Sequence, residues 1–221
     1  MKKNKGASGL ILSLVVFLMM LQGCSVLPPQ SPAPNYYILH CLNNIGQNGP
    51  VKGAVSPNHQ TLVVGPIEIP TYLQRTQVVI RSKGNGLLVS SFHRWAEPLD
   101  SAIERIVAKD IALLSGARIE SYPFSMNIPS YEDTLHLRLF VNVYELDTVE
   151  EEKKCRLDGE YVMLSPTGDE LIRDSFHLAS SIKTVSFPEA VRCENGLINQ
   201  LSKTIWESMA KILHKRSMGK H

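Results

Sequence analysis

The sequence lacks the familiar motifs of hydrolases, nucleotide-binding enzymes, metalloproteases and thiol oxidoreductases. It contains no Gly-x-Ser-x-Gly elbow, no glycine-rich loop ending in Gly-Lys-Ser/Thr, no His-Glu-x-x-His and no Cys-x-x-Cys. Its 7 histidines lie on separate predicted elements, without the close pairs that ligate a metal. We therefore expect no enzyme, no metal site and no non-covalent cofactor. A hydrolase would require separated residues to converge on folding.

The sequence also has few long apolar runs and almost no net charge. The chain has 221 residues, of which 43% are hydrophobic and 20% charged, as in an ordinary folded domain. Only one apolar run, near the start, is long enough to consider for a membrane, which excludes a polytopic membrane protein. Lys2, Lys3 and Lys5 supply the basic excess; without them 20 cations face 21 acidic residues. The sequence therefore has no electrostatic footprint for binding nucleic acid.

The first 23 residues have the organisation of a secretory signal. Three lysines precede an apolar core from Leu10 to Leu21, and the core leads directly to Gln22-Gly23-Cys24. This order resembles a bacterial lipoprotein signal, in which Cys24 receives a diacylglycerol and an N-acyl chain. Ser25, in place of an aspartate, favours the outer membrane. The alternative is a short signal anchor or a general signal peptide in which Cys24 is incidental.

Residues 24–35 are rich in proline and predict an extended tether. The stretch reads CSVLPPQSPAPN, and a proline-rich chain of this length reaches about 30 Å. Such a tether holds a folded domain clear of a membrane surface. We place that domain at residues 36–216 and a frayed tail at residues 217–221.

Within the domain, stretches with the period of a strand alternate with two amphipathic helices. Turn signals such as Lys83-Gly84-Asn85-Gly86 separate the strands, and Gly116 marks the end of the first helix. The pattern predicts an α/β fold, with a mixed, largely antiparallel sheet and two main helices packed on it. Strands are expected at 36–42, 62–69, 77–81, 87–92, 118–122, 135–146, 155–164 and 170–182, and helices at 99–114 and 187–213.

Two short motifs each admit a structural and a functional interpretation. Pro70, Tyr72 and Leu73 lie in a segment that we interpret as a bulge ending an edge strand, with a lipid site as the alternative. The second motif consists of His93, Arg94, Trp95 and Glu97 with their neighbours. In the structural interpretation, Trp95 fills the corner between a strand and the first helix, and Arg94 and Glu97 satisfy each other or the helix end. In the functional interpretation, the motif forms a partner-docking patch in which Arg94 and Trp95 are the anchors.

These motifs and a third one resemble a known family. The three stretches are Tyr36-Tyr37-x-Leu39, Gly65-Pro66 with Pro70-x-Tyr72-Leu73-x-Arg75, and His93-Arg94-Trp95-Ala96-Glu97-Pro98-Leu99. In them the chain resembles the ABC-type transport auxiliary lipoproteins, and the resemblance extends over nearly the whole mature chain. Phe124 stands where the family commonly has Trp after Tyr-Pro, and Leu157-Asp158 with Tyr161 replaces a segment that often carries Trp. Both departures concern packing residues.

The resemblance implies both a fold and a role. The implied fold is an α/β domain like the amino-terminal domain of TolB. The implied role is that of an accessory or adaptor component of an MCE-type intermembrane lipid transport system, anchored at the periplasmic face of the outer membrane. The implied partners are an MCE-domain periplasmic tube protein and its inner-membrane component, and a tubular partner would suit a homo-oligomeric ring.

A carrier that itself binds a lipid or another small apolar ligand is the alternative function. Such a carrier needs apolar residues in excess of its core, whereas each predicted helix has a single apolar stripe. The sequence therefore favours the adaptor.

Three cysteines remain once Cys24 carries lipid: Cys41, Cys155 and Cys193. In an oxidising compartment they allow three single pairings, each of which leaves one cysteine free. We expect Cys41 to be a small buried core residue. Cys155 and Cys193 form the preferred pair, because they lie where backbones can approach, although three free thiols are the favoured outcome overall.

Overall fold

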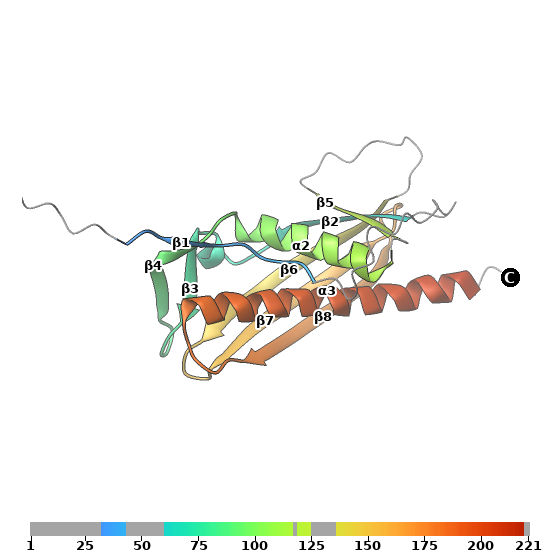
Figure 1. Ribbon diagram of the computed structural model, residues 1–221. Helices are drawn as coiled ribbons and strands as arrows, with labels where there is room; N and C mark the ends of the chain where they lie inside the picture. The colour runs from blue at the N-terminus through green and yellow to red at the C-terminus, as the bar shows by residue number, and fades with distance from the viewer. Residues whose placement is uncertain (1–31, 43–59, 117–118, 125–135, 219–221) are drawn as a thin grey trace, which may run out of the picture. The chain divides into compact units, whose positions relative to one another are not determined.

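The computed structural model of the chain describes residues 32–42, 60–116, 119–124 and 136–218 (Figure 1). The predicted signal peptide and Cys24 lie outside these residues. The chain from Pro34 onwards forms one compact unit. In chain order its elements are β1 Asn35–Tyr37, β2 Gln60–Glu68, the 3-10 turn η1 Thr71–Leu73, β3 Gln77–Arg81, β4 Leu87–Trp95, α2 Leu99–Leu114, β5 Ile119–Pro123, β6 His136–Val149, β7 Lys154–Leu164, β8 Glu170–Ser181 and α3 Phe187–Met218.

The eight strands form one open sheet organised around the long strand β6. On one side, β6 pairs antiparallel with β7, and β7 pairs antiparallel with β8. On the other side, the first part of β6 pairs with β2, which pairs with β5, and both pairings are parallel. On the same side as β2, the last residue of β6 pairs parallel with β3. Strand β3 pairs antiparallel with β4, and β4 pairs parallel with β1 at the edge of the sheet. The predicted fold class, a mixed and largely antiparallel sheet with two helices, is confirmed.

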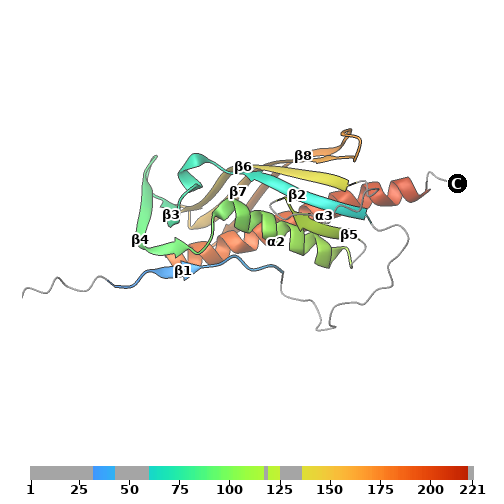
Figure 2. The ribbon, with the colours of Figure 1, turned by 90° about the horizontal axis from the view of Figure 1, so that it is seen from above.

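Both helices cover the same face of the sheet (Figures 1 and 2). Helix α2 packs on β2 and β5, whereas α3 packs on β6, β7 and β8 and also against α2. The apolar spacing of each helix explains this arrangement, because residues three and four apart form one stripe that is removed from water against the sheet. Fully buried members of the resulting core include Ile103, Ile106 and Ile111 of α2, Leu139 of β6, Leu157 of β7 and Leu201 and Ile205 of α3.

Several boundaries differ from those predicted. The first strand ends at Tyr37 rather than near residue 42, and α3 continues to Met218. The segment from Pro70 to Leu73 is a 3-10 turn rather than a bulge. It follows the end of β2, where Ile67 and Glu68 pair with β6 alone among the described strands. The predicted helix end at Gly116 is confirmed, since Gly116 adopts the left-handed φ of 59°.

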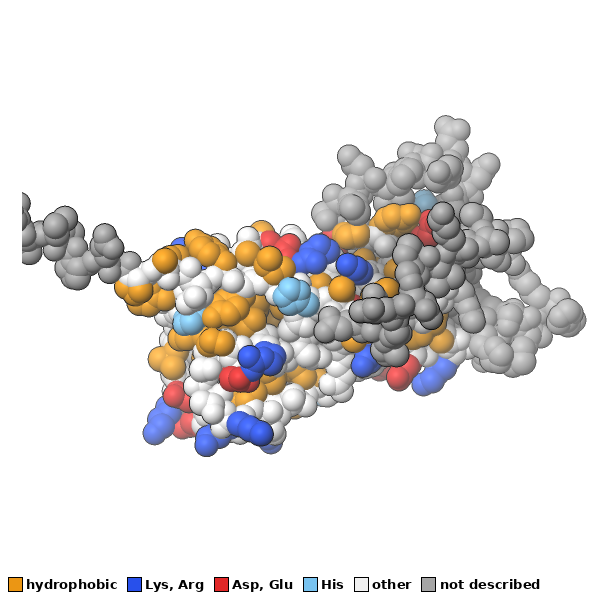
Figure 3. All heavy atoms as spheres, in the orientation of Figure 1, with side chains coloured by type: hydrophobic (Ala, Val, Ile, Leu, Met, Phe, Trp, Pro, Cys, Tyr) orange, Lys and Arg blue, Asp and Glu red, His pale blue; other side chains and the backbone are white. Residues whose placement is uncertain are grey.

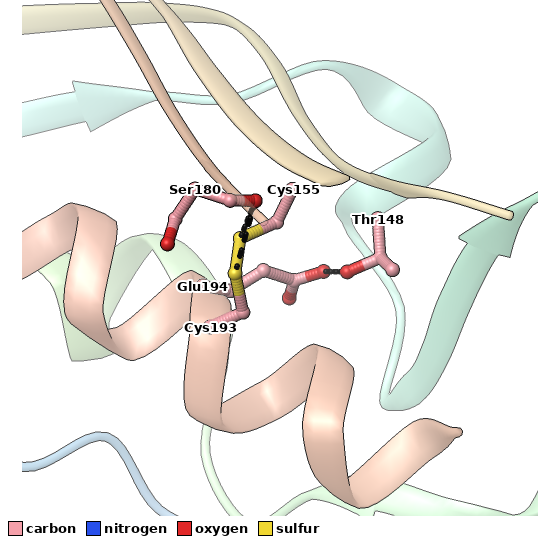
Figure 4. Close-up of a disulfide and its surroundings, with 5 residues drawn as sticks. All are labelled: Thr148, Cys155, Ser180, Cys193 and Glu194. Atoms are coloured by element: carbon pink, nitrogen blue, oxygen red, sulfur yellow. Dashed lines mark hydrogen bonds between the residues drawn. A yellow bond between two sulfur atoms is a disulfide. The ribbon is translucent and has the colours of Figure 1, made fainter. Parts of the chain in front are cut away.

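A disulfide joins Cys155 of β7 to Cys193 of α3, with a Cα–Cα distance of 6.2 Å (Figure 4). The preferred pairing is therefore confirmed, and the expectation that all three thiols stay free is wrong. The packing of α3 on β7 explains the result, because it brings the two backbones within bridging distance. Cys41 is free and half-buried against the core.

No helix in the described part of the chain is both long and apolar enough to cross a membrane.

Candidate functional site

The motif from His93 to Leu99 forms the corner where β4 turns into α2. Trp95 is only 5% exposed and belongs to the core, as the structural interpretation requires. Its backbone N–H donates to the carbonyl of Thr76 at 2.6 Å, and the N–H of Ala96 donates to the carbonyl of Tyr37 at 2.9 Å. The corner is thus held by β1 on one side and by the segment before β3 on the other. A Trp in this position packs the fold and offers no exposed anchor.

Glu97 pairs with Arg105 of α2 and not with Arg94. Arg105 also donates to the carbonyl of Leu39 at 3.4 Å. The helix explains this choice of partner, because Glu97 precedes its first turn and Arg105 extends back toward it along the helix surface. Of the two alternatives in the structural interpretation, the pairing of Arg94 with Glu97 is therefore wrong, whereas Glu97 does pair with a residue of the helix that follows it.

His93 connects three elements through its ring. The Tyr37 hydroxyl of β1 and His93 Nδ1 are 2.6 Å apart, and the two rings stack with centroids 5.7 Å apart. On α3, Phe187 stacks on the same imidazole at 5.0 Å. The Nδ1 atom and the ring of His93 thus have structural partners on β1 and α3, which indicates a packing role.

Arg94 differs from its neighbours because it makes no side-chain contact of this kind. It lies in register between Tyr36 of β1 and Gln77 of β3. Its Nε is buried and has no hydrogen-bond partner within the described residues. Since a buried donor without a partner is costly, Arg94 is the motif residue whose bonding capacity is least used.

The second motif is connected to the end of β6. Leu73 is buried in the core, and the Tyr72 hydroxyl donates to Asp147 Oδ1 at 2.8 Å. Asp147 is only 2% exposed and also accepts from Arg81 Nε at 2.7 Å. Burial, followed by the charge of Asp147, raises the pKa of Tyr72, and the hydrogen bond to Asp147 raises the pKa of Arg81. Together with Pro70 at the start of the turn, these residues fix η1 and form no opening for a lipid.

Large apolar side chains are exposed on β1, on β4 and immediately after β1. In Figure 3 hydrophobic side chains gather over the end of the domain where these strands lie. We call this set the β1–β4 surface. Its members are Tyr36 (62% exposed), Ile38 (52%), Leu88 (44%), Val89 (42%), Phe92 (41%) and Leu87 (38%).

The β1–β4 surface was not predicted, although the sequence holds a signal for it. Leu87, Leu88 and Val89 are consecutive, and consecutive strand residues point to opposite faces of a sheet. Such a run places apolar side chains outward unless both faces are covered. Both helices of this fold cover one face only.

A shallow hollow lies on the sheet where β2, β6 and β7 meet. Its volume is about 160 Å³, which is below the 300 to 1,000 Å³ of typical ligand pockets. Two glutamates contribute to a lining that consists of Pro66, Glu68, Phe140, Val141, Asn142, Glu160 and Val162. A hollow of this size and charge does not fit an acyl chain. Within the described ranges, no group of three His, Cys, Asp or Glu side chains is placed to hold a metal ion.

Two solved structures share the fold of the chain. An uncharacterized protein superimposes with a TM-score of 0.63 at 18% identity, over 80% of this chain and 99% of that one. A Xanthomonas campestris protein of the DUF330 family superimposes with a TM-score of 0.60 at 12% identity, over 83% of this chain and 99% of that one. A comparison with curated proteins finds no significant match.

The family comparison matches most of the chain. The matched residues, 45–206, extend from the segment before β2 into α3 and include the two motifs that form the corner and the η1 turn. They also include most of the sheet and its helical cover. The chain belongs to the family described as the ABC-type transport auxiliary lipoprotein component.

Proposed function

We propose that the protein is a lipoprotein of the outer membrane, anchored through Cys24, and an adaptor in an MCE-type intermembrane lipid transport system. Its role would resemble that of paraquat-inducible protein C. The observation that carries the proposal is the family match over residues 45–206, which follows a sequence with the order of a lipoprotein signal. Family membership supports an auxiliary role in transport. The outer membrane and the MCE partner are our extension of it.

The packing of the domain supports an adaptor rather than a carrier. The buried faces of α2 and α3 are used against the sheet, and the hollow between β2, β6 and β7 is too small for a lipid. An adaptor needs no cavity, because it acts through its surface. It also needs no covalent chemistry, so we propose that the protein is not an enzyme.

Crosslinking in intact cells followed by affinity capture of the full-length lipoprotein tests the proposal. We expect an MCE-domain protein, together with its inner-membrane component, among the captured partners. The Cys24→Ala variant is the matched control, because it keeps the domain and loses the anchor. Capture of other periplasmic proteins in place of an MCE-domain protein would contradict the proposed partnership.

Mass spectrometry of lipid extracted from the purified protein separates the adaptor from the carrier. A carrier retains about one phospholipid per chain, in addition to the covalent acyl groups. We expect no such stoichiometric lipid. Its presence would favour the alternative function, a periplasmic carrier of lipids or other small apolar ligands.

A further inference from the structure

Strand β4 leaves much of one edge unpaired within the described part of the chain. On its inner side β4 pairs with β3, and on its outer side β1 covers only His93, Arg94 and Trp95. The stretch from Leu87 to Phe92 therefore has no outer neighbour there. It carries four of the six apolar side chains of the β1–β4 surface.

Strand β8, at the opposite edge of the sheet, is protected against pairing with other chains, whereas the open stretch of β4 is not. Strand β8 pairs only with β7, and its exposed side chains include Arg173, Asp174 and His177. Charged side chains on an edge strand discourage pairing with other chains. The apolar stretch of β4 has no such protection, so this part of the surface is suited to contact with something other than water.

The stretch of chain that carries β3 and β4 has charges of one sign, and two acids near it, Glu97 and Glu145, face Arg105 and Arg81. Glu150 lies beside Arg81 at the end of β6. From Ile69 to Ala96 the sequence contains no Asp or Glu, and its cations are Arg75, Arg81, Lys83 and Arg94. Arg81 is neutralised by Asp147, whereas Arg75 and Lys83 are exposed and the Arg94 Nε lacks a partner. An apolar strand with exposed cations before it and Arg94 at its end complements an anionic and amphipathic partner. A second copy of the chain would instead bring like charges together.

The position of β1 in the sequence identifies such a partner. Asn35, the first residue of β1, follows Cys24 by eleven residues, and this proline-rich stretch reaches about 30 Å. A lipid on Cys24 thus keeps the entry to β1 within that distance of the bilayer. The β1–β4 surface includes the point at which the tether enters the domain.

We propose that the β1–β4 surface docks onto the surface of a phospholipid bilayer with anionic headgroups. Leu88 and Phe92 enter the interface between headgroups and acyl chains, and Arg94 at the end of β4 contributes positive charge near the phosphates. The docking rests on the proposed anchor at Cys24. It fixes the orientation of a domain that the tether alone would leave free to rotate, and it places the later turns of α3 away from the bilayer.

Depth-dependent fluorescence quenching tests this orientation with a matched pair of variants. Leu88 of β4 and Leu113 of α2 are equally exposed, at 44% and 42%, so Leu88→Trp and Leu113→Trp are comparable changes. Each lipidated full-length variant is reconstituted into phosphatidylethanolamine vesicles that contain brominated phosphatidylglycerol. The wild-type protein gives the background of Trp95 and Trp206. We expect quenching of the indole in Leu88→Trp and none in Leu113→Trp.

The charge contribution is measured in the Leu88→Trp background. One basic residue near an anionic bilayer contributes about five-fold to the docking equilibrium, so Arg94→Gln should reduce quenching accordingly. Arg138→Gln, on an exposed position of β6, is the control and should have no effect. Replacing phosphatidylglycerol by brominated phosphatidylcholine should also reduce quenching.

Each other outcome overturns the docking. Equal quenching in the two Trp variants would show that the domain has no preferred orientation. A protein that floats with the vesicles but shows no quenching in Leu88→Trp would retain its anchor and lose the proposed contact. If a crosslinker joins two copies through β4 and quenching is absent, the surface is an interface between copies. A protein that fails to float contradicts the anchor itself, and thereby both proposals.

Discussion

At the scale of single residues, adjacent side chains of the corner motif have opposite roles. Trp95 points into the core, whereas Arg94 lies beside Tyr36 on β1 with an unpartnered Nε. Alternation along a strand explains the difference, because neighbouring residues face opposite sides of the sheet. The same short motif thus contributes to folding through Trp95 and to the outer surface through Arg94.

Truncation of Trp95 is expected to destabilise the domain strongly. Trp95→Ala should lower the free energy of unfolding by about 3 to 5 kcal/mol, because it leaves a cavity among α2, β4 and the core. Phe92→Ala is the control on the same strand, where the side chain is 41% exposed, and should cost about 1 kcal/mol or less. Urea denaturation measures both values. Equal losses would show that Trp95 is not a core residue.

Glu194 is a fully buried acid beside the disulfide (Figure 4). Thr148 donates to its Oε1 at 3.0 Å. Burial, with a further contribution from the charge of Asp147, raises the pKa of Glu194 from 4.5 to about 8. The carboxyl group is therefore protonated in the folded protein at neutral pH and ionised in the unfolded chain.

The raised pKa predicts that stability falls as the pH rises from 4.5 to about 8. Over this range the folded state binds one proton more than the unfolded state, and the loss from this group approaches about 1 kcal/mol per pH unit. Glu194→Gln should remove this pH dependence. The free energy of unfolding of the variant, compared with that of the wild type at the same pH, should therefore be higher at pH 8 than at pH 5. Glu151→Gln, on an exposed turn, serves as the control. Parallel stability profiles for wild type and Glu194→Gln would contradict the assignment.

At the scale of elements, the disulfide holds α3 against β7. Cys155 is fully buried, and both sulfurs lie near the carbonyl oxygen of Ser180 on β8, at 3.6 and 3.7 Å. The bridge encloses the β7–β8 hairpin and the start of α3, with a separation of 38 residues. It thereby connects the helical layer with the antiparallel part of the sheet.

Removal of the bridge should destabilise the domain without changing its fold. Closing a loop of this length restricts the unfolded chain by about 3 to 4 kcal/mol, so the Cys155→Ser/Cys193→Ser variant should melt at a clearly lower temperature. A reducing agent should lower the melting temperature of the wild type and leave that of the double variant unchanged. Cys41→Ser is the control that keeps the bridge. Three thiols available to alkylation before reduction, in a protein lipidated at Cys24, would rule the bridge out.

The sequence was a good guide to local elements and a poor one to their pairing. The apolar spacing from Leu99 to Leu114 predicted α2 with its bounds, since a helix stripe is a local property. The parallel pairing of β1 with β4 joins segments that are far apart in the sequence, and no period reports it. The run Leu87-Leu88-Val89 signals apolar side chains on both faces of its strand, but which of them stay exposed depends on where the helices and β1 lie, and that is not a local property.

At the scale of the whole molecule, charge is divided along the chain. Glu68 is the single acidic residue among the first 96, and the other 20 of the 21 acidic residues follow. The sequence nearest the proposed anchor is thus apolar and cationic, whereas the later strands and α3 carry the acids. This division favours one orientation relative to an anionic bilayer.

Loss of the lipid anchor is expected from Cys24→Ala. The thiol of Cys24 is the predicted attachment point for the diacylglycerol, so its removal should abolish incorporation of labelled palmitate and release the protein from membranes or leave it unprocessed. Cys41→Ala is a matched control and should incorporate the label normally. Palmitate retained by Cys24→Ala would contradict the lipoprotein assignment at this residue.

The destination of the anchored protein is expected to depend on Ser25. In lipoproteins of this kind an aspartate after the lipidated cysteine favours retention in the inner membrane, so Ser25→Asp should shift the protein toward inner-membrane fractions in a density gradient. Ser31→Asp places the same charge within the tether but away from Cys24, and should remain with the outer membrane. Because docking of β4 requires only an anionic bilayer, quenching of a Leu88→Trp indole should persist in the relocated protein. Unchanged outer-membrane recovery of Ser25→Asp would show that sorting is determined elsewhere in the chain.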